Sequence, residues 1–157
     1  MNSKAFNPKD FEKKPARPLK LNASDSFTVD LAHPALPDKT YNEGTPWATP
    51  NSSGDHIQFA ADLNTQEWIS LNIPTVKIPT ADGSSSLRII PLNEYDGDKE
   101  RATMAGSLHN GSRLRFWSDF NGDVTLTRVG KQLTLRYQAS NNEGFEFSNG
   151  QFIFNDD

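Results

Sequence analysis

Apolar and polar residues alternate in short runs along most of the chain, which is the pattern of half-buried β-strands. The runs with the clearest alternation are residues 26–31, 55–61, 67–73 and 86–90. In the first run, Phe27, Val29 and Leu31 fall on one face. Thr75 to Ile78 predicts a further short edge strand between two prolines. No segment repeats apolar residues with a helical period over a useful length, so any helix is expected to be a single turn.

Residues 101–154 contain four tight-turn signals between short alternating runs. The signals are Asn110-Gly111, Asn121-Gly122, Gly130-Lys131 and Asn149-Gly150. Asn-Gly pairs favour two-residue hairpin loops because both central residues of a type I′ turn need a positive φ. The stretch therefore predicts an antiparallel β-meander.

Two-residue turns also fix which residues face each other in this meander. The apolar partners in this register are Met104 with Trp117, Trp117 with Leu126, Leu126 with Leu135, and Val124 with Tyr137. The last hairpin places Phe145 and Phe147 opposite Phe154 and Phe152. Residues 112–118 are apolar on both faces, so that strand is either covered on both sides or interrupted by a bulge.

About ten short strands with polar turns predict an all-β fold for residues 26–157. We expect an antiparallel β-sandwich, jelly-roll-like or a meander, or a flattened barrel. A chain of 157 residues suits one such domain.

Two segments do not fit the strand pattern. Residues 1–25 form a Pro-rich arm in which six basic residues outnumber two acidic ones before residue 21. Residues 32–54 form a long loop in which four prolines argue against regular strand pairing. The arm is expected to pack either on its own body or on a neighbouring subunit. The residues expected to contact a partner are Lys4, Phe6, Phe11, Lys13, Lys14, Arg17 and Trp47.

The sequence contains no recognisable catalytic, cofactor or metal motif. It has no cysteine, and His33, His56 and His109 have no metal-ligand spacing, which favours surface or edge histidines. The Asp96-Gly97-Asp98 turn does not match a calcium loop. We therefore expect no catalytic residues, no cofactor and no metal, and a protein that is not an enzyme.

An alternative binding face follows from the predicted register of the meander. It would combine Arg113, Arg115 and Arg128 with Trp117 and Tyr137, and it would place Arg115 directly opposite Arg128. Aromatic rings beside cations suit single-stranded nucleic acid or sugars. The competing interpretation is that these arginines pair with carboxylates of the same or a neighbouring chain.

A basic arm and a long loop before a compact β body resemble the architecture of small virion proteins, such as capsid decoration or cement proteins of tailed bacteriophages. This resemblance concerns architecture alone and identifies no residues. It implies a structural role, with other protein subunits as partners, in a homo-oligomer or a capsid-like shell. The net charge of −4 makes nucleic acid an unlikely general partner, and no signal peptide or membrane segment is visible. The expected location is the virion, or the cytoplasm if the protein is not viral.

Overall fold

The computed structural model describes residues 7–156, and residues 1–6 and 157 lie outside the described part. The eleven strands are β1 (Ser26–His33), β2 (Leu36–Tyr41), β3 (Trp47–Pro50), β4 (His56–Asp62), β5 (Trp68–Pro74), β6 (Gly83–Ile89), β7 (Arg101–His109), β8 (Leu114–Trp117), β9 (Asn121–Val129), β10 (Gln132–Ser140) and β11 (Glu146–Asn155). Helical structure in the described residues is limited to three short 3₁₀ turns, η1 (Pro8–Phe11), η2 (Thr75–Lys77) and η3 (Leu92–Glu94). The predicted all-β fold is confirmed.

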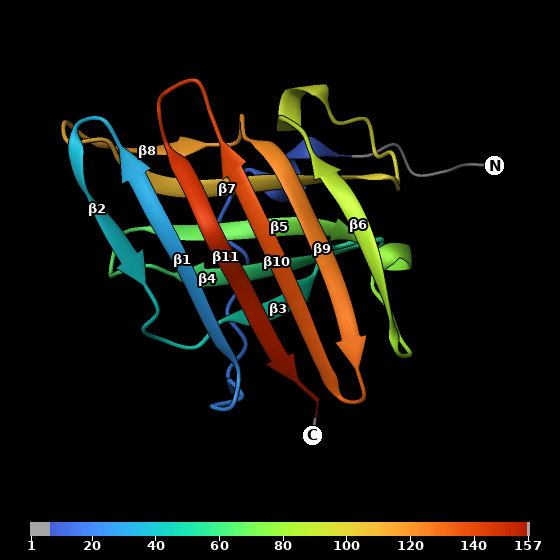
Figure 1. Ribbon diagram of the computed structural model, residues 1–157. Coiled ribbons are helices and arrows are strands. Elements are labelled where there is room, and N and C mark those ends of the chain that lie inside the picture. The colour runs from blue at the N-terminus through green and yellow to red at the C-terminus, as the bar shows by residue number, and fades with distance from the viewer. Residues whose placement is uncertain (1–6, 157) are drawn as a thin grey trace.

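The strands form two layers that curl into a flattened half-barrel (Figure 1). The front sheet has the order β2-β1-β11-β10-β9-β6, and the back sheet has the order β8-β7-β5-β4-β3. The sheets join where β6 and β7 pair in parallel, with Arg88 opposite Arg101 and Ile89 opposite Ala102. All other strand pairs are antiparallel. The opposite side, between edge strands β2 and β3, stays open.

The hydrophobic core lies between the two sheets because every second residue of each central strand points inward. Phe27, Val29 and Leu31 do share the core-facing side of β1, as predicted. The ring of Tyr137 also enters this core and stacks on Phe152 with their centroids 5.5 Å apart. It lies against Gly150, where an added Cβ would be 2.5 Å from the ring.

The predicted turn at Gly130-Lys131 is confirmed. It pairs Leu126 with Leu135 and Val124 with Tyr137. The turn predicted at Asn110-Gly111 is wrong by two residues in register, because Trp117 faces Gly106 instead of Met104. The loop there has four residues, and the side chain of Asn110 accepts hydrogen bonds from the backbone N–H groups of Ser112 and Arg113.

The hairpin predicted at Asn121-Gly122 is wrong, because both residues belong to the start of β9. The preceding β8 pairs with β7 in the back sheet, whereas β9 lies in the front sheet. The apolar row through Trp117 and Leu126 is therefore not formed. β8 carries apolar side chains on both faces: Trp117 packs toward the core, while Phe116 packs near Trp68 on the outer side.

The hairpin predicted at Asn149-Gly150 is also wrong, because β11 runs without interruption from Glu146 to Asn155. Asn149 has a φ of 52°, and the pairing of β11 shifts register here against both neighbouring strands. The Asn149 side chain donates a hydrogen bond to Asp30 Oδ2 at 2.9 Å. Asn-Gly supplies the left-handed residue of a β-bulge in this strand, where the sequence suggested a turn.

The Pro-rich segment 32–54 contributes two edge strands of the fold, β2 and β3. Pro37 lies in β2 and Pro50 ends β3, which corrects the expectation that this segment is irregular throughout. An edge strand tolerates proline because one of its sides needs no ladder hydrogen bond. The strand predicted for Thr75 to Ile78 is instead the 3₁₀ turn η2.

Candidate functional site: an arm face and an opposite groove

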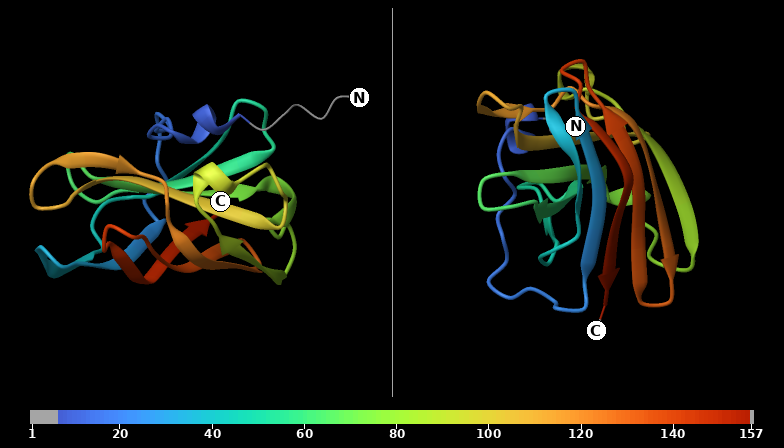
Figure 2. Two further views of the ribbon diagram at one scale, coloured as in Figure 1. Left: turned by 90° about the horizontal axis from the view of Figure 1, so that it is seen from above. Right: turned by 60° about the vertical axis from the view of Figure 1, so that its left-hand side comes forward.

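The N-terminal arm crosses the outer face of the back sheet (Figure 2). Its main anchor is Phe11, which is completely buried together with Leu92 and Tyr95. The Phe11 ring also meets the ring of His56 edge-on, with centroids 5.0 Å apart. The described part of the arm, from residue 7 onward, therefore packs on its own chain.

Beneath the arm lies a chain of hydrogen bonds through a buried histidine. His56 Nδ1 is 2.8 Å from Asp55 Oδ1, and His56 Nε2 is 2.7 Å from the Tyr95 hydroxyl oxygen. Burial lowers the pKa of His56, against the opposing effect of Asp55, and burial raises the pKa of Tyr95. Burial raises the pKa of Asp55, but hydrogen bonds from Ser53, His56 and Asn51 outweigh it and leave the pKa below its usual value. The geometry fits a neutral imidazole between a carboxylate and a phenol.

The second half of the arm is fixed at the far end of β4. Lys14 Nζ lies 2.5 Å from Asp62 Oδ1, and Arg17 donates to Asp62 Oδ2 at 3.1 Å. Both cations also lie over the indole ring of Trp47, at 5.6 and 5.5 Å from its centroid. Trp47 itself is only 2% exposed, so it packs within its own chain.

Polar side chains between these two anchors are buried. Gln58 donates to Asn72 Oδ1 at 3.0 Å, and Asn72 donates to Thr103 Oγ1 at 2.9 Å, across three neighbouring strands. Gln58 also reaches the backbone carbonyl of Asp10 in the arm at 3.4 Å. Ser70, in the same sheet face, is 1% exposed. The outer face of the back sheet thus carries polar side chains that are nevertheless buried.

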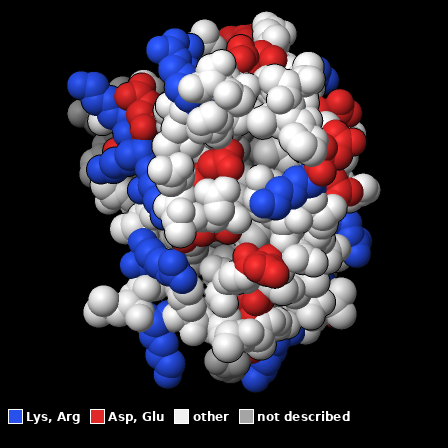
Figure 3. Space-filling view, turned by 90° about the vertical axis from the view of Figure 1, so that its left-hand side faces the viewer, with Lys and Arg blue, Asp and Glu red and all other residues white. Residues whose placement is uncertain are grey.

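The outward surface of the arm, together with β8, presents exposed cations and exposed apolar side chains, and we call it the arm face. Its members are Lys9, Lys13, Lys14, Arg17, Lys20, Leu114 and Phe116. Leu114 and Phe116 are 39% and 37% exposed, and Phe116 lies beside Trp68, with ring centroids 6.1 Å apart. Viewed from the open edge, Lys and Arg side chains form a column along the side where the arm runs (Figure 3). Lys4 and Phe6, predicted as contacts, lie outside the described residues.

The alternative face predicted from the meander is not assembled in the fold. Arg115 faces Leu108 rather than Arg128, and it lies over the Trp117 ring at 5.2 Å. Arg128, near the end of β9, donates hydrogen bonds to the backbone carbonyl of Pro79 and to the carboxylate of Asp156. Tyr137 is in the core, and Arg113 is exposed in the β7–β8 loop. The face was predicted from a hairpin at Asn121-Gly122, which would place β8 next to β9. The fold has no hairpin there, and β8 and β9 lie in different sheets.

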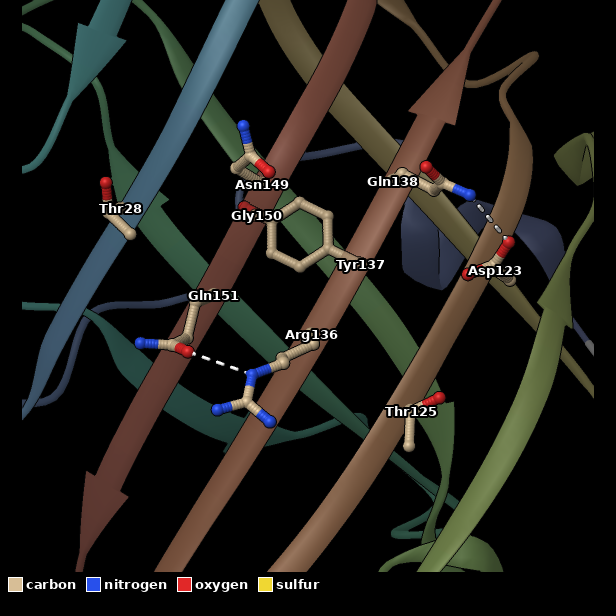
Figure 4. A pocket seen from close by; sticks show the side chains of 9 residues that line it. All are labelled: Thr28, Asp123, Thr125, Arg136, Tyr137, Gln138, Asn149, Gly150 and Gln151. Atoms are coloured by element: carbon tan, nitrogen blue, oxygen red, sulfur yellow. Dashed lines mark hydrogen bonds between the residues drawn. The ribbon is translucent and has the colours of Figure 1, made fainter.

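The front sheet instead carries a groove on its outer face, of about 590 Å³ (Figure 4). The side chains that point outward into it come from four adjacent strands, β1, β11, β10 and β9. They are Thr28, Gln151, Asn149, Arg136, Gln138, Asp123 and Thr125. The face predicted from the sequence does not include Arg136, and the Asn149-Gly150 pair, which forms the bulge, predicts a turn instead.

Hydrogen bonds between neighbouring strands orient the groove side chains. Arg136 Nε donates to Gln151 Oε1 at 3.1 Å, and Gln138 donates to Asp123 Oδ2 at 3.2 Å (Figure 4). Within residues 7–156, Arg136 forms no ion pair with a carboxylate. The hydrogen bonds from Asn149 and Thr40 lower the pKa of Asp30 at the edge of the groove.

Two of the three histidines are buried, contrary to the expectation that they are surface or edge residues. His33 is 9% exposed and His56 is 1% exposed. His33 and His109 line a second cavity of about 230 Å³ at the open side of the half-barrel. The described residues contain no group of three or more acidic or histidine side chains placed to hold a metal ion.

Comparison of the chain with protein-family models, with curated proteins and with solved structures finds no match. The described residues also contain no helix of the length and apolarity that would cross a membrane. The class of the protein therefore rests on its fold, an all-β half-barrel with an arm laid across one sheet.

Proposed function

We propose that the protein is a non-enzymatic structural or interaction component of a larger assembly, and that it docks through the arm face. The observation that carries this proposal is the combination of exposed cations with exposed Leu114 and Phe116 on a four-residue edge strand. An edge strand with exposed apolar side chains is a typical protein interaction site, because the backbone groups on its outer side can pair with another chain. The complementary surface would be acidic, with an apolar patch.

The virion is the assembly that suits this surface best, with the protein acting as a decoration or cement protein on a shell. The chain is small, its sheets are almost entirely antiparallel, and the exposed cations of the arm lie on one side of the molecule. Edge strands β2 and β3 at the open side offer a further contact to neighbouring copies, as the prediction for the Pro-rich segment suggested. Electrostatic docking of this kind weakens as salt screens the charges.

Fractionation of native material tests the proposal. Protein in its own source, separated by rate-zonal sedimentation, should travel with a large particle at low salt. It should be released in about 1 M NaCl, where the screening length falls to about 3 Å. A protein that sediments as a free monomer at low salt contradicts the proposal.

A charge variant locates the contact. Lys9→Ser, Lys13→Ser and Lys20→Ser together remove three exposed cations that are free of ion pairs to residues 7–156. The matched control is Arg88→Ser, Lys131→Ser and Arg136→Ser, which removes the same charge from the front sheet and its Gly130-Lys131 turn. Rebinding to stripped particles should be lost in the first variant and kept in the control. Equal rebinding by both variants would place the contact outside the arm face.

A further inference from the structure

The front sheet and the arm lie on opposite sides of the molecule (Figure 2). Docking through the arm face therefore leaves the groove on the front sheet open to solvent. Its volume of about 590 Å³ lies within the range of about 300–1,000 Å³ that is usual for ligand sites. Neighbouring strands are about 4.8 Å apart, so the row from Thr28 on β1 to Thr125 on β9 spans about 14 Å. That length accommodates more than one sugar ring.

The chemistry of the lining selects the ligand. Guanidinium, amide and carboxylate groups are planar and present two donors or acceptors side by side, which matches two neighbouring hydroxyl groups. The groove has Arg136 as a donor, Asp123 as an acceptor, and Gln138 and Gln151 as both. Two threonine hydroxyls border these groups at either end of the row.

The charges of the groove cancel. The charged side chains of the lining are Arg136 and Asp123. Beside the groove, Arg88 is the strand partner of Asp123, and Asp30 accepts a hydrogen bond from Asn149. The cations of the groove would attract a nucleic acid or another polyanion, and the carboxylates of the groove would repel it to a similar extent. A neutral ligand that both donates and accepts hydrogen bonds is favoured.

The site is also held in shape before a ligand arrives. Arg136 and Gln151 fix each other, and Gln138 is fixed by Asp123. The left-handed Asn149 is locked by Asp30, and backbone strain of this kind is common at ligand sites. A pre-oriented set of polar groups loses less conformational entropy on binding.

We propose that this groove binds a neutral oligosaccharide, with Arg136 and Asp123 hydrogen-bonding neighbouring hydroxyl groups of the sugar. The described lining has no exposed aromatic ring for sugar stacking, because the Tyr137 ring is turned into the core. Binding to a single chain is therefore weak, and an assembly with many copies would gain affinity through multivalency.

Affinity electrophoresis through gels that contain neutral soluble glucans, mannans or galactans tests this proposal on the full chain. At least one of these polysaccharides should retard the protein. Arg136→Ala should weaken binding at least tenfold, and Gln151→Ala should weaken it less, because it removes one neutral contact and the partner that orients Arg136 but leaves the guanidinium in the groove. Arg113→Ala, an exposed arginine of the β7–β8 loop, is the matched control and should bind normally.

Three outcomes overturn the proposal: no retardation by any neutral polysaccharide, equal retardation of the Arg136→Ala variant, or retardation by heparin or single-stranded DNA alone. The variants alter exposed or half-buried side chains, so circular dichroism should confirm that each is folded. Sedimentation with a particle is measured separately, so a failed sugar assay leaves the docking proposal to its own test.

Discussion

The outer faces of the two sheets carry similar polar side chains, but those of the front sheet are open to solvent and those of the back sheet are buried. On the front sheet, Arg136, Gln138 and Thr125 line a groove that is open to water. On the back sheet, Gln58, Asn72 and Thr103 are at most 5% exposed. The difference is the arm, which lies across the back sheet and supplies Phe11 as an anchor (Figure 2). Alternation of polar and apolar residues thus marks the two sides of a strand without telling which side meets solvent.

The anchor gives the largest expected effect. Phe11→Ala removes a fully buried aromatic ring and should lower the free energy of unfolding by about 3 kcal/mol. Phe116→Ala, on the exposed edge strand, should cost under about 1 kcal/mol. Urea denaturation of both variants measures the two values. Similar losses would mean that the arm is no better packed than the surface of β8.

The buried polar row comes next. Asn72→Ala leaves Gln58 Nε2 and Thr103 Oγ1 without their shared partner and should cost about 2 kcal/mol, because buried polar groups that lose a hydrogen bond retain their desolvation penalty. Gln138→Ala breaks a comparable bond on the open face and should change stability by about 0.5 kcal/mol or less. Equal effects would show that water reaches both faces.

Acidification should lower the free energy of unfolding through His56, which lies on the covered face of the back sheet. The pKa of His56 is lower in the folded protein than in the unfolded chain, so the unfolded chain binds the proton more readily. The stability contributed by neutral His56 is complete above pH 6.5 and is lost as the pH falls from there toward the folded pKa. The free energy of unfolding should therefore decrease from pH 7 to pH 5, and His56→Gln should flatten this slope. A slope that His56→Gln leaves unchanged would assign the loss to other groups.

The smallest effect is expected at the other end of the arm. Asp62→Asn weakens the ion pairs to Lys14 and Arg17, which are 43% and 53% exposed in their side chains, and should cost about 0.5 kcal/mol. The loss should shrink as salt is added. A loss above that of Asn72→Ala would make this ion-pair cluster, rather than Phe11, the main anchor.

The sequence predicts the strands well and their partners only in part. Alternation places β1, β4, β5 and β6 within a few residues, and Gly130-Lys131 fixes one hairpin. Asn-Gly signals wrongly predict hairpins at two positions. At Asn149-Gly150 the positive φ serves a β-bulge, which it can do as well as a turn. At Asn121-Gly122 the pair simply begins a strand after a change of sheet.

The functional surfaces are harder to derive for a related physical reason. A single hydrophobic residue such as Phe11 has no period around it, so its burial depends on a pocket built by distant residues. The groove requires the correct order of β1, β11, β10 and β9, which one misplaced strand destroys. Trp117 and Tyr137 share a face only in the register that a hairpin at Asn121-Gly122 would set, and the fold has no hairpin there.

Cysteine reactivity gives the most direct test of the covered and open faces, because the chain has no cysteine of its own. Ser70→Cys places a thiol on the outer face of the back sheet, where Ser70 is 1% exposed, and Ser86→Cys places one on the open face of the front sheet. The Ser86→Cys thiol should react with a thiol reagent at the rate of a free peptide, while the Ser70→Cys thiol stays protected until Phe11→Ala is added or the protein unfolds. Equal reaction rates for the two thiols in the otherwise unaltered chain would contradict the account.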